Sequence, residues 1–548
     1  MSATSPSPKA GEKKGSMLDI IEKLGNKVPH PVLMFLYLII FVIVLSQLLA
    51  WANISVTDQI AVTVPVMVDP EYYEDTTQPG LNADMEVDYP EFVIEERTIA
   101  IRSLLSTEGI RFLFTSFVSN FQGFGVVAVT FVAMMGAGVA EAAGMFSALI
   151  RKLVKVAPQK WITFIIVFVG VLTSIASDAG YLILIPLGAA AFLSLRRHPL
   201  AGMAAAYAGV SAVFAVNIIF TPIDSMLTEI TNEAIGLTSG APITIAANYF
   251  FMVASSIFIA LVATVVTDRI VEPRLGKYVP DADHAAAYES ADQSELSPQE
   301  SLGLKYAGIA TLVFVVMILL LSVPNGAPLH KPEGYEGNSP LMDSLLFLIT
   351  LLLLIAGIAF GKGAGTIKSS NEVIAAITKT FSGLAGLVFM LLMISQFIAY
   401  FNYTNMPTVT AIWMAELLER ANIGALPLLI GFMLVIMLLD IIIPGVVPKW
   451  AIFAPVFIPI FTRLGTTPQT VLAAYRIGDS PMNVITPLMV YLPFIITVAQ
   501  GYDKKSGLGT IIALMLPYTL VILVAWILFF IFWFVLGVPL GPGYPVSL

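Results

Sequence analysis

The chain has 548 residues, of which 57% are hydrophobic and only 12% are charged, and its formal net charge is −9 at pH 7. Soluble domains carry about a quarter charged residues, so this composition excludes a soluble globular protein and predicts a helical protein that crosses a membrane several times. The long apolar runs do not alternate as the strands of a membrane barrel do. The absence of cysteine excludes disulfides and thiolate metal sites, and we expect no nucleic-acid partner.

The first hundred residues predict a tail, one span and one loop. Residues 1–30 are rich in Ser, Pro and Lys, and they are expected to form a cytoplasmic tail. The apolar run 31–52 has the length of about 20 residues that a membrane span needs. Residues 53–105 are polar and acidic, which predicts a periplasmic loop.

Residues 107–268 contain a pattern that occurs twice in the chain. After an apolar span, segment 160–198 is too long for one span and too short for two, and it is interrupted at Ser-Asp-Ala-Gly (177–180). This predicts a re-entrant hairpin, since irregular backbone at membrane depth is tolerated where it lines a cavity. Segment 201–239 is apolar up to Asn217 and then breaks, so it predicts a discontinuous helix.

The same pattern returns near the end of the chain. Residues 269–304 are polar and predict a cytoplasmic linker, and residues 305–361 predict two connecting spans. The second copy occupies 380–537, with a hairpin at 424–465 and a broken helix at 468–500.

The two breaks correspond, because the first copy reads Asn217-Ile-Ile-Phe-Thr-Pro and the second reads Asn483-Val-Ile-Thr-Pro. Lysine and arginine gather on one side of this arrangement, which the positive-inside rule assigns to the cytoplasm. The N-terminus is then cytoplasmic, the C-terminus is periplasmic, and the two copies are inverted. The predicted fold is all-α, with about nine transmembrane helices and two re-entrant hairpins in inverted repeats, as in the ion-transporter superfamily. Inverted repeats with broken helices support alternating access.

Polar side chains at bilayer depth are costly and mark functional sites. Asp178 at the tip of the first hairpin acts either as the N-cap of the following half-helix or as a cation ligand or proton carrier. The polar residues at the two breaks either satisfy broken backbone or, with freed carbonyls, provide oxygen ligands for Na⁺ near Asn217 and Asn483. These ion-coupling candidates are Asn217, Thr221, Asp224, Asn483 and Thr486.

Arg476 and Asp479 are three residues apart and share a face if the segment is helical. They form either a self-neutralising buried pair or a site in which Arg476 binds a substrate carboxylate through its planar fork. In the second case Asp479 tunes that charge or carries a proton. Trp450 either stacks on an aromatic substrate or packs in the core, and Asp440 is a secondary candidate.

Five segments near these breaks have a recognisable sequence: SDAGYLILIPLGA, NIIFTPID, SQFIAYFNYTN, KWAIFAPVFIPIF and AAYRIGDSPMNVITPLMVYLPFI. In their order and spacing they resemble the aminobenzoyl-glutamate transporter (AbgT) family. The resemblance implies a homodimer in the lipid bilayer of the bacterial inner membrane, each protomer having its own pathway. It implies that the functional positions are Asp178, Trp450, Pro468, Arg476 and Asp479.

The resemblance also implies a function, namely uptake of p-aminobenzoyl-glutamate or export of sulfonamide antimetabolites, driven by a gradient of H⁺ or Na⁺ and with no other cofactor. The sequence departs from the family where PGVVPKW replaces a hydroxyl-rich turn and SAVFAVN replaces SGGFSAN, which makes the cavity tip more apolar. The alternative is a dicarboxylate or other organic-anion carrier of the same fold. An enzyme is not expected, because no base is visible beside a nucleophile.

Overall fold

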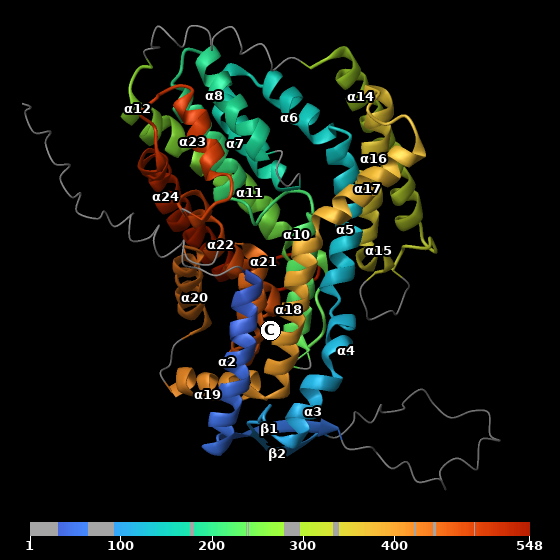
Figure 1. The fold of residues 1–548 in the computed structure, drawn as a ribbon, viewed down its shortest axis with the longest axis vertical. Coiled ribbons are helices and arrows are strands. Elements are labelled where there is room, and N and C mark those ends of the chain that lie inside the picture. The colour runs from blue at the N-terminus through green and yellow to red at the C-terminus, as the bar shows by residue number, and fades with distance from the viewer. Residues whose placement is uncertain are drawn as a thin grey trace, which may run out of the picture.

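The protein is a bundle of membrane-length and shorter helices with one small sheet (Figure 1). In the described residues, β1 (Ser55–Thr63) and β2 (Phe92–Ala100) pair antiparallel, with Ser55 opposite Ala100, inside the predicted periplasmic loop. The computed structural model describes residues 31–63, 92–175, 180–236, 238, 240–278, 296–331, 339–420, 424–441, 445–486 and 488–547.

Eight helices in the described part of the chain are long and apolar enough to cross a membrane, and a ninth appears if one pair bent by 114° counts as a single span. The bent pair joins α6 (Met145–Lys155) to the segment Gln159–Ile175. The predicted fold class is therefore confirmed. The eight are α2 (Pro31–Trp51), α4 (Phe117–Gln122) with α5 (Val126–Ala142), α11 (Tyr249–Val266) continuing through α12 (Glu272–Leu275), α14 (Pro298–Ser322), α16 (Leu345–Ala364), α18 (Ala385–Tyr403), α21 (Val446–Arg463) and α24 (Leu508–Val535).

Both predicted hairpins have two helical arms in the described residues. In the first, α7 (Ile162–Leu172) is the entering arm and α8 (Ile185–Ser194) is the leaving arm. In the second, α20 (Ala425–Asp440) enters and α21 leaves. Gly445, at the start of α21, has φ +96°, a backbone conformation that favours glycine.

Both predicted discontinuous helices are broken in the middle. The first consists of α9 (Pro199–Tyr207) and α10 (Pro222–Ile235), and the second consists of α22 (Pro468–Asp479) and α23 (Leu492–Gln500). None of these four halves is long enough to span a membrane by itself, since a span needs about 20 residues. The break leaves backbone N–H and C=O groups without helical partners. Polar side chains where the halves meet can form hydrogen bonds with these groups.

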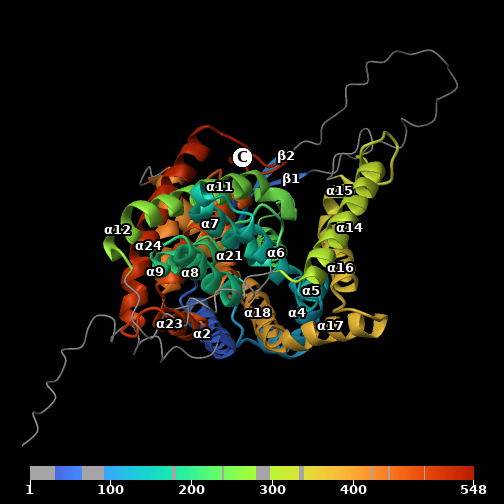
Figure 2. The ribbon, with the colours of Figure 1, turned by 90° about the horizontal axis from the view of Figure 1, so that it is seen from above.

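The two repeats meet at these broken elements. Helix α10 of the first repeat packs against α21 and also contacts α22, both of the second repeat. Helices α14 and α16 pack against each other, α16 also packs against α5, and the two stand at one edge of the bundle (Figure 2). The ends of α8 and α23 lie at one end of the molecule, and the sheet and α19 (Met406–Arg420) lie at the other (Figure 1).

The structure adds helices and moves some predicted boundaries. Helices α3 (Thr107–Thr115), α17 (Ser370–Gly383) and α19 fall where the sequence predicted no span. The predicted linker 269–304 is helical at both described ends, because α12 continues the preceding span and α14 begins at Pro298. Ser297 and Glu300 form a capping box there, so the helix begins in polar residues outside the apolar run.

Candidate functional site

A cavity of about 450 Å³ lies where the two repeats meet. This volume is within the range of roughly 300–1,000 Å³ that small-molecule sites occupy. Its described lining comes from both hairpins and both breaks, as the inverted-repeat interpretation predicts. The lining includes Ser174, Ile175 and Tyr181 of the first hairpin, Phe214 and Pro222 of the first break, Gly445 and Val446 of the second hairpin, and Asn483, Thr486 and Tyr491 of the second broken helix.

Five ionisable side chains are buried in the same region of the fold, each with an exposed fraction of 2% or less, and none of them is among the described lining residues of the cavity. They comprise two cations and three carboxylates, so the fully ionised group of described residues carries one negative charge in excess. They come from four different elements: Asp224 from α10, Asp440 from α20, Lys449 from α21, and Arg476 and Asp479 from α22.

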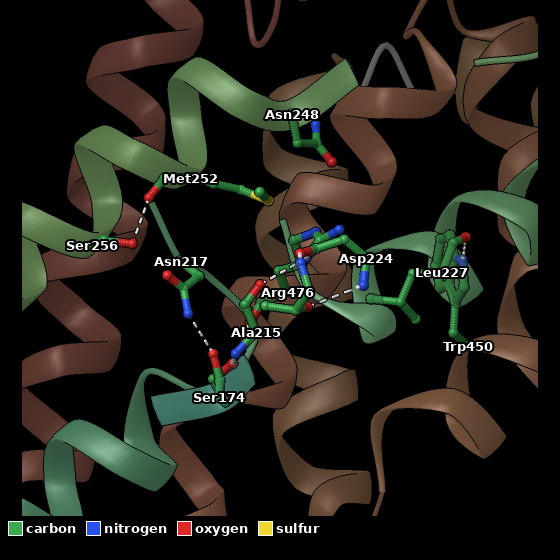
Figure 3. A network of polar contacts seen from close by, with 12 residues as sticks. Ser174, Ala215, Asn217, Asp224, Leu227, Asn248, Met252, Ser256, Trp450 and Arg476 are labelled. Carbon is green, nitrogen blue, oxygen red and sulfur yellow. Dashed lines mark hydrogen bonds and ion pairs between the residues drawn. The ribbon is translucent and has the colours of Figure 1, made fainter. Parts of the chain in front are cut away.

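Arg476 connects the two repeats. Its Nη1 donates to Asp224 Oδ1 at 2.6 Å and to the carbonyl oxygen of Ala215 at 2.7 Å (Figure 3). Asp224 Oδ2 in turn accepts from the backbone N–H and the hydroxyl of Thr221, both at 2.8 Å. This carboxylate also lies in the first turn of α10, where the helix dipole favours negative charge. Arg476 is therefore held in place by the break of the other repeat.

Lys449 lies between two carboxylates. Its Nζ forms ion pairs with Asp440 Oδ1 and, at 2.7 Å, with Asp479 Oδ1. The hydroxyl of Tyr475 lies 2.5 Å from the carbonyl oxygen of Val446 and 3.2 Å from Asp479 Oδ1. The second oxygen of each carboxylate has no hydrogen-bond partner among the described residues.

The pairing differs from the one that the spacing of Arg476 and Asp479 suggested. The two residues do share the buried helix α22, but Arg476 bonds to Asp224 and Asp479 pairs with Lys449. The reason is that packing brings an opposite charge to each from another element, and burial makes such pairing necessary. The self-neutralising pair predicted from the i, i+3 spacing is not present.

Trp450 is fully buried and packs inside the protein. Its indole N–H donates to Thr231 Oγ1 at 2.9 Å, and the centroid of its ring lies 4.6 Å from that of Tyr475. It is not among the described residues that line the cavity. This geometry favours the packing interpretation of Trp450 over direct stacking on a substrate.

Asn217 and Thr221 satisfy backbone groups at the first break. The Asn217 amide donates to Ser174 Oγ at 2.8 Å (Figure 3) and to the carbonyl oxygen of Val171 at 3.0 Å, and its Oδ1 accepts from the N–H of Ile219 at 3.1 Å. Thr221 forms a capping box with Asp224 at the start of α10. Asn217 thus ties the first break to the tip of the first hairpin.

The remaining predicted site residues occupy different places. Asn483 and Thr486 both line the cavity, and Thr486 Oγ1 lies 3.4 Å from the carbonyl oxygen of Ile441. Pro468 is the first residue of α22, eleven residues before Asp479, and is not in the described cavity lining. Asp178 lies outside the described residues.

Sequence reasoning gave no role to three residues that the structure places at or beside the site. Lys449 bridges Asp440 and Asp479, and a lysine beside a proline-rich break at membrane depth is itself a signal of function. Tyr181 and Tyr491 line the cavity from opposite repeats. Tyrosine is common at span ends, so no local pattern distinguished these two.

Comparison with known proteins points to one group of transporters. The model of the AbgT putative transporter family matches residues 16–548. The p-aminobenzoyl-glutamate transport protein of Escherichia coli (strain K12) is 30% identical over 539 residues, which are 98% of each chain.

Two solved structures have the same fold over nearly the whole chain. The YdaH transporter of Alcanivorax borkumensis, described as having an unusual topology, has a TM-score of 0.80 and 33% identity, covering 94% of this chain and all of that one. MtrF of Neisseria gonorrhoeae, described as illuminating a class of antimetabolite efflux pumps, has a TM-score of 0.84 and 35% identity, covering 97% of this chain and all of that one.

Proposed function

Since the chain belongs to the AbgT putative transporter family, we propose that it is a secondary active transporter of p-aminobenzoyl-glutamate and related aromatic carboxylates. The observation that carries the proposal is the cavity of about 450 Å³ at the junction of two inverted repeats, beside buried Arg476 and Lys449. A cavity of this size accepts a drug-sized molecule. The named relative from Escherichia coli supports this choice of cargo.

Arg476 is the group that we expect to bind a carboxylate of the cargo. Both of its side-chain hydrogen bonds to described residues use Nη1, and its Nε has no partner among those residues. A guanidinium offers five N–H donors, so donors remain for a second carboxylate. Cargo binding then weakens the bond to Asp224, which is a bond between the two repeats. Exchange of one carboxylate for another is a direct way to link binding to movement of the repeats.

We propose H⁺ as the coupling ion, carried by the carboxylates of the buried cluster. The oxygens that suited Na⁺ at the first break are engaged, because Asn217 bonds to backbone and Thr221 bonds to Asp224. Asp440 and Asp479 instead each keep one oxygen without a partner among the described residues. One proton would neutralise the single excess negative charge of the five ionised side chains.

The test is flux in proteoliposomes that contain the purified protein, with pH and Na⁺ gradients imposed separately. We expect saturable accumulation of labelled p-aminobenzoyl-glutamate under a pH gradient and none under a Na⁺ gradient alone. No accumulation under either gradient would refute the cargo, and accumulation driven by Na⁺ alone would refute the proton. Succinate and citrate in the same assay test the dicarboxylate carrier.

Sulfonamide export is a second candidate, favoured by the similarity to MtrF over 97% of this chain. Alternating access is reversible, so one site serves both directions and the gradients decide which occurs. Counterflow of labelled p-aminobenzoyl-glutamate against internal sulfamethoxazole tests this. We expect trans-stimulation, and its absence would separate the two cargoes.

We further propose that the protein is a homodimer in the bacterial inner membrane, with the N-terminus in the cytoplasm and the C-terminus in the periplasm. The eight span-length helices of the described residues and the family support a membrane location. Reporter fusions at each terminus test the orientation, and native mass spectrometry of the detergent-solubilised protein tests the dimer.

A further inference from the structure

Two tyrosine rings from different repeats stack on each other at the wall of the cavity. Tyr181 belongs to the first hairpin, in the short π-helix η4 (Gly180–Leu184), and Tyr491 directly precedes α23 in the second broken helix. Their ring centroids are 4.2 Å apart and their planes differ by 13°. Both line the cavity, so this contact joins the repeats at the place where the cargo is expected.

The position of Tyr181 is fixed by its surroundings. Its side chain is 4% exposed, and its hydroxyl donates to Ser211 Oγ at 3.3 Å. Gly180 lets the backbone lie close to the other arm of the hairpin, because a Cβ at that position would be 2.3 Å from Thr173 Oγ1. Tyr491 is only partly buried, so it is the more accessible ring of the pair.

The other aromatic candidate at the site does not offer a stacking face to the cavity. Trp450 is 0% exposed, packs against Tyr475 and is held by Thr231. Among the described lining residues, the tyrosine pair is the place where two rings already lie parallel and in contact. A planar aromatic group can replace such a contact with similar contacts of its own.

We propose that Tyr181 and Tyr491 form the subsite for the aromatic ring of the cargo, and that their mutual stacking closes this side of the empty cavity. This inference rests on the proposed function. At 4.2 Å the pair leaves no space for a third ring. A ring held between two others separates them by about 9 Å, twice the shortest usual stacking distance, so the pair opens by about 5 Å.

The opening has a consequence for transport. Tyr181 moves with the first hairpin and Tyr491 moves with the second broken helix, so parting the rings separates elements of the two repeats. The cargo carboxylate acts at Arg476, where another bond between the repeats is made. The aromatic ring and the carboxylate of one molecule would then release two contacts between the repeats.

The first test compares two cargoes in four variants. Tyr181→Leu and Tyr491→Leu remove a ring, whereas Tyr181→Phe and Tyr491→Phe keep it and serve as matched controls. Binding of p-aminobenzoyl-glutamate and of hexanoyl-glutamate, which has no ring, is measured by titration calorimetry. We expect each Leu variant to bind the aromatic cargo roughly fivefold or more weakly, with hexanoyl-glutamate within about twofold of wild type. Both Phe variants should bind both cargoes as wild type does.

The second test measures the opening itself in a protein with every tyrosine retained. The natural chain has no cysteine, so Leu182→Cys and Val490→Cys give two specific spin-label sites beside the pair. These side chains are 47% and 82% exposed, which favours labelling without repacking. We expect saturating p-aminobenzoyl-glutamate to lengthen the distance between labels by about 5 Å, and hexanoyl-glutamate to leave it unchanged.

The outcomes separate this inference from the proposed function. If wild-type protein neither binds nor transports p-aminobenzoyl-glutamate, the proposed function and the subsite both fail. If wild type transports it, but the Leu variants weaken both cargoes equally or neither, the subsite alone is refuted. An unchanged label distance at saturation likewise refutes the subsite, and this result does not depend on whether the Leu variants fold.

Discussion

Replacement of Lys449 by methionine should destabilise the protein strongly, because the lysine separates two buried carboxylates. Lys449 pairs with Asp440 and Asp479, which are 0% and 1% exposed as side chains. Methionine has a similar length but no charge, so it leaves both carboxylates without a cation. Removing one partner of a buried ion pair costs about 3–5 kcal/mol. That is a large fraction of the roughly 5–15 kcal/mol by which folded proteins are stable.

A double variant tests whether charge is the cause. Lys449→Met with Asp440→Asn removes one charge of each sign and keeps the same excess of one carboxylate over cations. The double variant should therefore recover at least half of the stability that the single Lys449→Met change loses. The control is Lys152→Met, since Lys152 is an exposed lysine of α6 and such surface changes fall within about 0.5 kcal/mol.

The measurement is the free energy of unfolding of the purified protein in mixed micelles, titrated with SDS and followed by circular dichroism. The reasoning is wrong if Lys449→Met lies within about 0.5 kcal/mol of wild type, as expected only for surface changes. It is equally wrong if the double variant is less stable than the single one. Either result would mean that the cluster is not held together by the lysine charge.

Three further predictions concern transport in proteoliposomes. Arg476→Ala and Asp479→Ala should each abolish accumulation of p-aminobenzoyl-glutamate while the protein still inserts and dimerises; normal transport by both would remove them from the site. Asp178→Asn should stop or uncouple transport, and full concentrative uptake would contradict its coupling role. Asp224→Asn should weaken the contact of Arg476 with the first repeat, so that exchange of internal and external cargo no longer responds to pH; a wild-type pH response would contradict this.

The broken helices and hairpins could be predicted from the sequence because their cause is local. Proline and glycine interrupt backbone hydrogen bonds, and the polar residues beside them are costly at membrane depth, so both leave a signal in the same few residues. The correspondence between the segments at Asn217 and Asn483 identified the repeat for the same reason. Both residues lie at breaks in the structure, and Asn483 also lines the cavity.

The charge pairing could not be predicted because its cause is distant in the chain. The helical period relates Arg476 only to residues three or four positions away, such as Asp479, whereas its partner Asp224 is 252 positions away. The same limit applies to Trp450, whose ring packs against Tyr475 on another helix. A sequence indicates which groups need a partner at depth, but packing of the repeats decides which partner they obtain.

The arrangement of charges suggests why α22 carries two ionisable residues. Arg476 reaches the first repeat through Asp224, and Asp479 reaches the arms of the second hairpin through Lys449. Both ion pairs are made by one helix of twelve residues, α22. A movement of Arg476 with this helix therefore also moves Asp479. Under the proposed function, a cargo carboxylate that displaces Asp224 from Arg476 would also shift Asp479 relative to Lys449. We therefore propose that α22 is the element through which cargo binding at Arg476 is linked to the coupling ion at the carboxylates.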